Sequence, residues 1–164
     1  MKFQKIYEKA VHNVLNRIHI PASNLNLPRR NMPQILAKDF DDYINWLKYE
    51  GVGITNTEVN CTSLRCSQLD INEDKVIDLI VTNASNLKNP IIISNDGYVV
   101  DGHHRFLAIL NKSLNTEYVP INTYKIDMPI RELIKKTMTY ANVKFRDVDN
   151  NFYDRPDKTV KDAF

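Results

Sequence analysis

The stretch PIIISNDGYVVDGHHRFLA, residues 90–108, predicts the strand–turn–strand–helix unit around which the fold is built. Its β-branched run at residues 91–93 is typical of a short buried strand. Asn95-Asp96-Gly97 predicts a tight hairpin turn, because these residue types tolerate the positive φ that such turns need. Residues 98–100 then supply the partner strand, and a helix begins near His103.

Apolar periodicity and capping signals place the remaining elements on both sides of this unit. Before this unit we expect a helix over 2–18, an irregular loop over 24–35, a helix capped by Asp39 and ended by Gly51 and Gly53, and a strand over 57–64. A further helix should follow the capping box Asp70-Ile71-Asn72-Glu73. After the unit we expect a strand over 118–126 and a helix that has Pro129 in its first turn and runs to about Thr139. This order predicts an α+β fold in which helices flank a small mixed sheet.

Composition bounds the class of protein. A chain of 164 residues suggests one domain. A net charge of +2 argues against a strongly electrostatic nucleic-acid-binding protein, although it allows a local basic patch. The sequence has no apolar stretch of bilayer-spanning length and no apolar signal core, so we expect a cytoplasmic protein without a membrane partner. Cys61 and Cys66 are expected to be reduced, buried thiols.

The segment Asp101-Gly102-His103-His104-Arg105 is the main candidate site, because it lies where a strand ends and a helix starts. The first turn of a helix has unpaired N–H groups and the positive end of the helix dipole, so it favours an anion. Gly102 lets an anion approach the backbone, and Arg105 offers a planar fork for phosphate oxygens. His103 and His104 can move protons near neutral pH. Asp101 can bind a divalent metal, orient a histidine or accept a proton.

Each of these five residues also has a structural explanation when it is taken singly. Asp101 can be a plain helix cap, the two histidines can contact solvent, and Arg105 can form a surface ion pair. Together, however, five polar or glycine residues interrupt an apolar strand and an apolar helix. Such a break in local consistency is expected at a functional site.

The same segment resembles the core signature of the ParB/sulfiredoxin superfamily. Partition proteins of this superfamily show Gly-Glu-Arg-Arg at the turn, sulfiredoxins show Gly-Cys-His-Arg, and free serine kinases show Asp-Gly-His-His-Arg, which is the form found at 101–105. Residues 64–80 also resemble the family's preceding box, and the resemblance covers about residues 60–136. It implies a ParB/sulfiredoxin-like core over 57–146, an N-terminal helical extension and loop over 1–56, and a polar, loosely held tail over 147–164.

The resemblance implies that a nucleoside di- or triphosphate (ATP, ADP or CTP) binds at this turn, often with Mg²⁺. Gly102, His103, His104 and Arg105 would cradle phosphate, and Asp101 would lie near the reacting group and hold the metal. The aligned serine kinases have an acidic base where this chain has Gln68. Since glutamine cannot accept a proton, free serine kinase activity is not expected, and Gln68 is a candidate for nucleotide binding only. Sulfinic-acid repair is not expected either, because histidine replaces the cysteine nucleophile.

Arg29 and Arg30 stand together in the irregular loop over 24–35. Long loops in compact domains are often functional, so this loop can fold over the site and supply phosphate contacts, or touch a nucleic-acid backbone. The alternative is a solvated basic loop.

Three functions remain open from the sequence. The first is a nucleotide-dependent enzyme of phosphoryl transfer or phosphate-ester hydrolysis, in which His103 or His104 shuttles a proton. The second is a ParB-like nuclease that acts on DNA or RNA. The third is a non-catalytic nucleotide switch or an inhibitor protein that binds a host partner.

Overall fold

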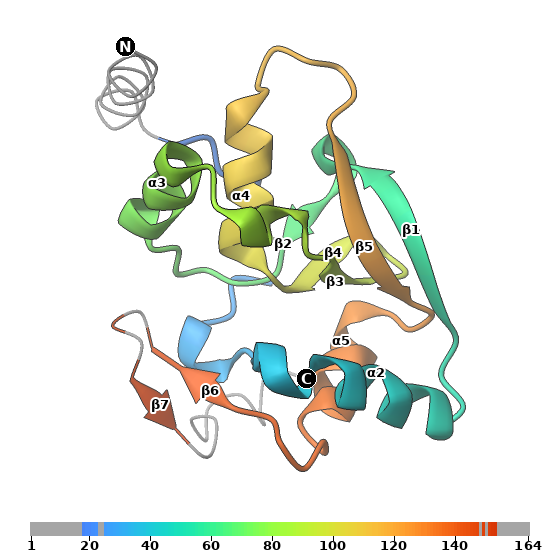
Figure 1. Ribbon diagram of the computed structural model, residues 1–164. Coiled ribbons are helices and arrows are strands. Elements are labelled where there is room, and N and C mark those ends of the chain that lie inside the picture. Colours follow the sequence, from blue (N-terminus) through green and yellow to red (C-terminus); the bar gives the residue numbers. More distant parts are fainter. Residues whose placement is uncertain (1–17, 23–24, 148, 150, 154–164) are drawn as a thin grey trace.

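The computed structural model describes residues 18–22, 25–147, 149 and 151–153. This part of the chain is α+β, as expected, and a five-stranded mixed sheet lies between two layers of helices (Figure 1). The strands are β1 (Ile54–Asn60), β2 (Arg65–Cys66), β3 (Ile91–Ser94), β4 (Tyr98–Asp101), β5 (Pro120–Ile126), β6 (Phe145–Arg146) and β7 (Phe152–Tyr153). The α-helices are α2 (Phe40–Tyr49), α3 (Glu73–Thr82), α4 (His103–Lys112) and α5 (Ile130–Thr137). Short 3-10 helices are η1 (Arg29–Asn31), η2 (Ala37–Asp39), η3 (Cys61–Ser63) and η4 (Ser85–Lys88).

The main sheet has the strand order β1-β5-β3-β4-β2. The β1–β5 and β3–β4 pairs are antiparallel, whereas β5–β3 and β4–β2 are parallel. The predicted hairpin is confirmed as β3–β4, with Gly97 at a φ of +85° in its turn. The predicted helix near His103 is confirmed as α4, which follows β4 directly. β6 and β7 form a separate two-stranded sheet.

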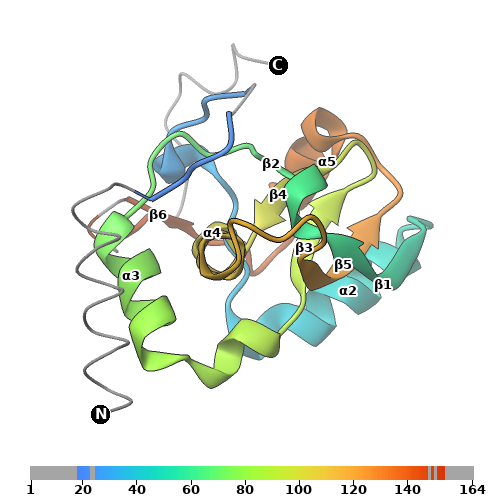
Figure 2. The same ribbon diagram turned by 90° about the horizontal axis from the view of Figure 1, so that it is seen from above.

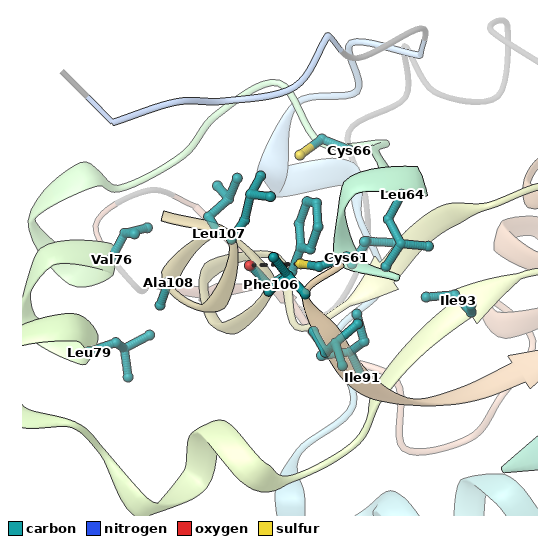
Figure 3. Close-up of a cluster of buried hydrophobic side chains, with 14 of the residues drawn as sticks. Cys61, Leu64, Cys66, Val76, Leu79, Ile91, Ile93, Phe106, Leu107 and Ala108 are labelled. Atoms are coloured by element: carbon teal, nitrogen blue, oxygen red, sulfur yellow. Dashed lines mark hydrogen bonds between the residues drawn. The ribbon is translucent and has the colours of Figure 1, made fainter. Parts of the chain in front are cut away.

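The two faces of the sheet carry two apolar clusters. Ile91 and Ile93 point to the face covered by α3 and α4, where Cys61 and Phe106 also lie (Figure 3). Ile92 points to the opposite face, which α2 and α5 cover. Because successive side chains of a strand alternate between faces, a continuous apolar run such as 91–93 requires this double covering. Seen from above, α3 lies beside α4 on one side of the sheet (Figure 2).

Both cysteines lie in the first apolar cluster as free, fully buried thiols, as expected. The Cys61 Sγ donates a hydrogen bond to the Phe106 carbonyl at 3.7 Å. Burial raises the pKa of Cys61 and of Cys66 to about 12. The two thiols are therefore packing groups rather than nucleophiles.

The strand predicted over 57–64 is displaced along the chain. β1 begins at Ile54 and ends at Asn60, and the chain then turns into η3. Asn60 ends the strand because its Oδ1 accepts hydrogen bonds from the Thr62 N–H at 3.2 Å and from the Val119 N–H at 3.1 Å. The side chain of Asn60 thus offers the backbone an alternative to the ladder of the sheet.

The capping box predicted at residues 70–73, with Asp70 as the helix cap, is wrong. The N-cap residue of α3 is Asn72, whose Oδ1 accepts a hydrogen bond from the Lys75 N–H at 3.1 Å. Asp70 lies before the helix, and its Oδ2 accepts a hydrogen bond from the Arg29 N–H at 2.9 Å. The acid that resembles a cap therefore fixes a distant segment instead.

Three further expectations concern the ends of elements and of the chain. Pro129 is the N-cap residue of α5 rather than part of its first turn. In the polar tail, residues 152–153 pair with β6, so the start of this segment is held in a hairpin. The helix predicted over 2–18 lies, but for its last residue, outside the described residues. Among the described residues, no helix combines the length and the apolar character that crossing a bilayer requires.

Candidate functional site

A cavity of about 510 Å³ lies at the end of the sheet where β3 begins and β4 ends. Residues from both helical layers line it. It brings together seven of the eight residues singled out from the sequence, namely Arg29, Gln68, Asp101, Gly102, His103, His104 and Arg105. The eighth, Arg30, is exposed and does not line the cavity.

A β-bulge in β4 places Asp101 at the cavity. Ile93 pairs with Val99, but Ile92 pairs with Asp101, so β4 has one extra residue between these two pairs. A bulge of this kind changes the direction of the side chain that follows it. Burial raises the pKa of the Asp101 carboxyl, and the nearby Arg105 guanidinium opposes this rise.

Gly102 makes the turn from β4 into α4 possible. Its φ of +98° lies in the left-handed region, which residues with a side chain rarely adopt. A Cβ at this position would lie 2.6 Å from the Ile91 Cγ2 and 3.1 Å from an Arg105 Nη2. Packing against β3 and the guanidinium, rather than space left for a ligand, therefore requires glycine here.

His103 is a buried hydrogen-bond acceptor. Its Nε2 lies 3.3 Å from the Ser67 N and 3.4 Å from the Gln68 N, and both of these N–H groups donate to it. Since Nε2 accepts, the ring proton is on Nδ1. Burial lowers the pKa of His103 to about 3, and the positive charge of Arg29 adds to this effect.

His104 plays a parallel role one residue further on. Its Nε2 accepts a hydrogen bond from the Asn72 N–H at 3.1 Å. Burial, with the charges of Arg29 and Lys75, lowers its pKa to about 3 as well. Both imidazoles are therefore neutral at physiological pH and connect the segment 67–72 to the start of α4. This geometry favours positioning over the proton shuttling expected from the sequence, which needs a pKa nearer 7.

Arg105 is held against the beginning of β3. Its Nη1 donates to the Asn89 carbonyl at 3.1 Å and to the Pro90 carbonyl at 3.3 Å, while its Nη2 lies above Gly102. The two carbonyls fix the plane of the guanidinium at the wall of the cavity. A guanidinium held in this way needs little further ordering to bind an anion.

Three more cations line the same cavity, from three other parts of the chain. Arg29 on η1 is only 2% exposed, and Lys75 on α3 and Arg146 on β6 are half-buried. Burial and the neighbouring charges of Arg29 and Arg146 lower the pKa of Lys75. The carboxylates that line the cavity are those of Asp101 and Asp41, so positive charge is in excess.

The segment that carries Arg29 is fixed to the chain just before α3. Leu27 forms a parallel bridge with Gln68, and the Leu69 N–H donates to the Leu27 carbonyl at 2.7 Å. The Asp70 carboxylate then accepts the Arg29 N–H. Gln68 is itself buried, and its side-chain amide donates to the Asp70 carbonyl. The loop predicted over 24–35 does reach the site, through Arg29.

Lys75 and Arg146 could not be found from the sequence. Lys75 lies among the polar residues of an amphipathic helix, and Arg146 lies in a strand of two residues near the tail. Neither belongs to a motif, and only tertiary packing brings them to the cavity.

The described residues contain no group of three or more histidine, cysteine, aspartate or glutamate side chains that could hold a metal ion. A structural metal centre made by these side chains is therefore absent from this part of the chain. A Mg²⁺ ion that binds together with a nucleotide needs fewer protein ligands, because it commonly uses one or two carboxylates together with phosphate oxygens and water. Asp101 fits that limited role.

The chain matches no protein-family model, no curated protein and no solved structure. Its function is therefore inferred from the cavity itself.

Proposed function

We propose that the cavity binds the phosphate groups of a nucleoside di- or triphosphate and supports phosphoryl transfer or phosphate-ester hydrolysis. The observation that carries this proposal is the convergence of Arg29, Lys75, Arg105 and Arg146 on one cavity beside Asp101. Buried and partly buried cations stabilise anionic oxygens more strongly than exposed ones do, because water screens them less. Phosphoryl transfer depends mainly on such positioning and charge.

Asp101 is the carboxyl group that the geometry offers to a reacting phosphate. Because burial raises its pKa, this carboxylate takes up a proton more readily than an exposed one. It can therefore accept a proton from a hydroxyl nucleophile. When Mg²⁺ is bound, it would neutralise phosphate charge, and Asp101 is the residue that would hold it.

A ParB/sulfiredoxin-like fold is part of this proposal. The strand, turn and helix over 90–108 support it, since β4, Gly102 and α4 follow one another in the order that the signature needs. The cavity volume of about 510 Å³ suits a small molecule, which favours a nucleotide over a DNA or RNA strand as the ligand.

A second candidate function is nucleotide binding without catalysis. The observation that favours it is the state of His103 and His104, whose Nε2 atoms already accept backbone N–H groups and whose pKa values are lowered to about 3. With Gln68 in place of an acidic base, Asp101 is then the remaining candidate for proton transfer. A nucleotide switch needs the cations of the cavity but not this carboxylate.

Calorimetric titration with ATP, ADP, CTP and inorganic tripolyphosphate, with and without Mg²⁺, tests the anion site. Lys75→Gln should weaken binding about tenfold, since a charge-assisted hydrogen bond contributes roughly 1.5–3 kcal/mol. The matched control is Lys48→Gln, on the exposed side of α2 and outside the cavity. Equal affinities in the two variants would show that the anion does not bind here.

Release of inorganic phosphate from bound nucleotide separates the two candidates. If the protein is an enzyme, Asp101→Asn retains nucleotide binding and loses turnover. If wild-type protein binds nucleotide and shows no turnover with any nucleotide or added hydroxyl acceptor, the non-catalytic function holds.

A further inference from the structure

The side of the cavity formed by α2 and β5 is aromatic. The rings of Phe40 and Tyr124 have their centroids 5.3 Å apart and are tilted by 55°. Both rings are half-buried, and both line the cavity. Partly exposed aromatic rings in a cavity provide apolar contact and a π surface for a planar ligand.

The sheet sets the distance between this aromatic side and the cationic side. Tyr124 lies opposite Ile92 of β3, and Ile92 lies opposite Asp101 of β4. Two strand spacings therefore separate Tyr124 from Asp101, which is about 10 Å. A ligand that fills the cavity can place a ring against Tyr124 and an anionic group beside Asp101 and Arg105.

Asp41 gives the aromatic side a charge opposite to that of the cationic side. It follows Phe40 in the first turn of α2, is exposed, and lines the cavity. A carboxylate accepts hydrogen bonds and repels phosphate, whereas the four cations attract phosphate. This polarity would orient a bound molecule, with its anionic end at Arg105 and its hydrogen-bond donors at Asp41.

We propose that Phe40, Tyr124 and Asp41 form a ring subsite that prefers a nucleobase with an amino group over the matching base with a carbonyl at that position, namely adenine over hypoxanthine or cytosine over uracil. This inference rests on the proposed function, because the phosphate groups must anchor the ligand at the cationic side. Adenine and cytosine present an amino group that donates to a carboxylate. Hypoxanthine and uracil present a carbonyl at the same position, which would place two acceptors against each other.

The test compares ligands that differ only at this group, by calorimetric titration of ATP against ITP and of CTP against UTP. ATP should bind at least about tenfold more tightly than ITP, or CTP at least about tenfold more tightly than UTP, as expected for a hydrogen bond to a charged group. Asp41→Asn should abolish this preference, because an amide can donate to a carbonyl as well as accept from an amino group. The control is Asp74→Asn, in the first turn of α3 and outside the cavity.

Inorganic tripolyphosphate isolates the contribution of the ring. Tyr124→Leu should weaken the better-bound nucleotide about tenfold or more and leave the affinity for tripolyphosphate unchanged. Tyr49→Leu, at an exposed position of α2 outside the cavity, should change neither. Phe40→Leu provides a second variant if Tyr124→Leu does not fold.

The outcomes separate the ring subsite from the anion site. Equal affinities within both ligand pairs in the wild-type protein, or a Tyr124→Leu variant that loses as much affinity for tripolyphosphate as for nucleotide, would overturn the ring subsite alone. If wild-type protein binds neither tripolyphosphate nor any nucleotide, the proposed function fails and the ring subsite with it.

Discussion

Replacement of Gly102 by alanine should destabilise the protein for two separable reasons. The φ of +98° costs a residue with a side chain about 1–2 kcal/mol. The new Cβ would also lie 2.6 Å from the Ile91 Cγ2, which is fully buried in the apolar cluster beneath α4, and overpacking of this kind costs about 1–3 kcal/mol. We expect a total loss of about 2–5 kcal/mol, a large part of the stability of a typical domain.

Gly51 is a matched control within the same chain. Its φ of +78° is also positive, but nothing lies within 4 Å of the position that a Cβ would take. Gly51→Ala should therefore cost about 1–2 kcal/mol, which is the backbone contribution alone. Urea denaturation followed by circular dichroism gives both free energies of unfolding.

A double-mutant cycle with Ile91→Ala isolates the clash. In that background the contact with Cγ2 at 2.6 Å is gone, whereas the Cβ of residue 91 at 3.0 Å and the Arg105 Nη2 at 3.1 Å remain. Gly102→Ala should therefore cost less than in the wild-type background, although still more than Gly51→Ala. If Gly102→Ala costs the same in both backgrounds, or no more than Gly51→Ala in the wild-type background, the close packing of Gly102 on β3 is refuted.

Three other predictions follow from buried or capping groups. His103 and His104, whose folded pKa values are lowered to about 3, should give nuclear magnetic resonance signals that do not titrate between pH 5 and 8. The unfolded chain binds protons at these histidines from about pH 6.5 downward, so each should contribute a loss of stability of about 1–2 kcal/mol at pH 5. Asp101, with its raised pKa, acts in the opposite direction. A flat profile of unfolding free energy against pH would contradict this. Cys61 and Cys66 should not react with a disulfide reagent at pH 8 until the protein unfolds, and rapid labelling of native protein would show that they are accessible. Asn72→Ala should cost about 0.5–2 kcal/mol in urea denaturation, because it removes the cap of α3, and a smaller loss would mean that the cap contributes little.

Local chemistry explains why the centre of the fold could be predicted. The run at 91–93, the turn with Gly97 and the helix that begins at His103 depend on neighbours within a few residues, so the sequence contains the whole signal. The same holds for α2, where Tyr43 and Leu47 recur at helical spacing and are buried.

Contacts between distant segments explain what could not be predicted. Asp70 has the sequence position of a helix cap, but the Arg29 N–H, 41 residues away, binds its carboxylate. β2 has two residues and exists because Cys66 lies opposite Val99, in a strand formed much later in the chain. His103 and His104 were expected to move protons, but their Nε2 atoms accept hydrogen bonds from backbone N–H groups of segment 67–72, which no local pattern reveals.

Segments from near the start and near the end of the described residues line the cavity together. Arg29 arrives on η1 and Arg146 on β6, two elements that contact each other although nearly the whole fold separates them in sequence (Figure 1). Contacts of such long range cost the entropy of closing the intervening loop, so we expect them to form late in folding. During synthesis, a nascent chain would thus gain its complete set of cations only when the last strands emerge. A molecule that binds there would recognise chains in which β6 has docked on η1, and it would shift the balance toward the folded form.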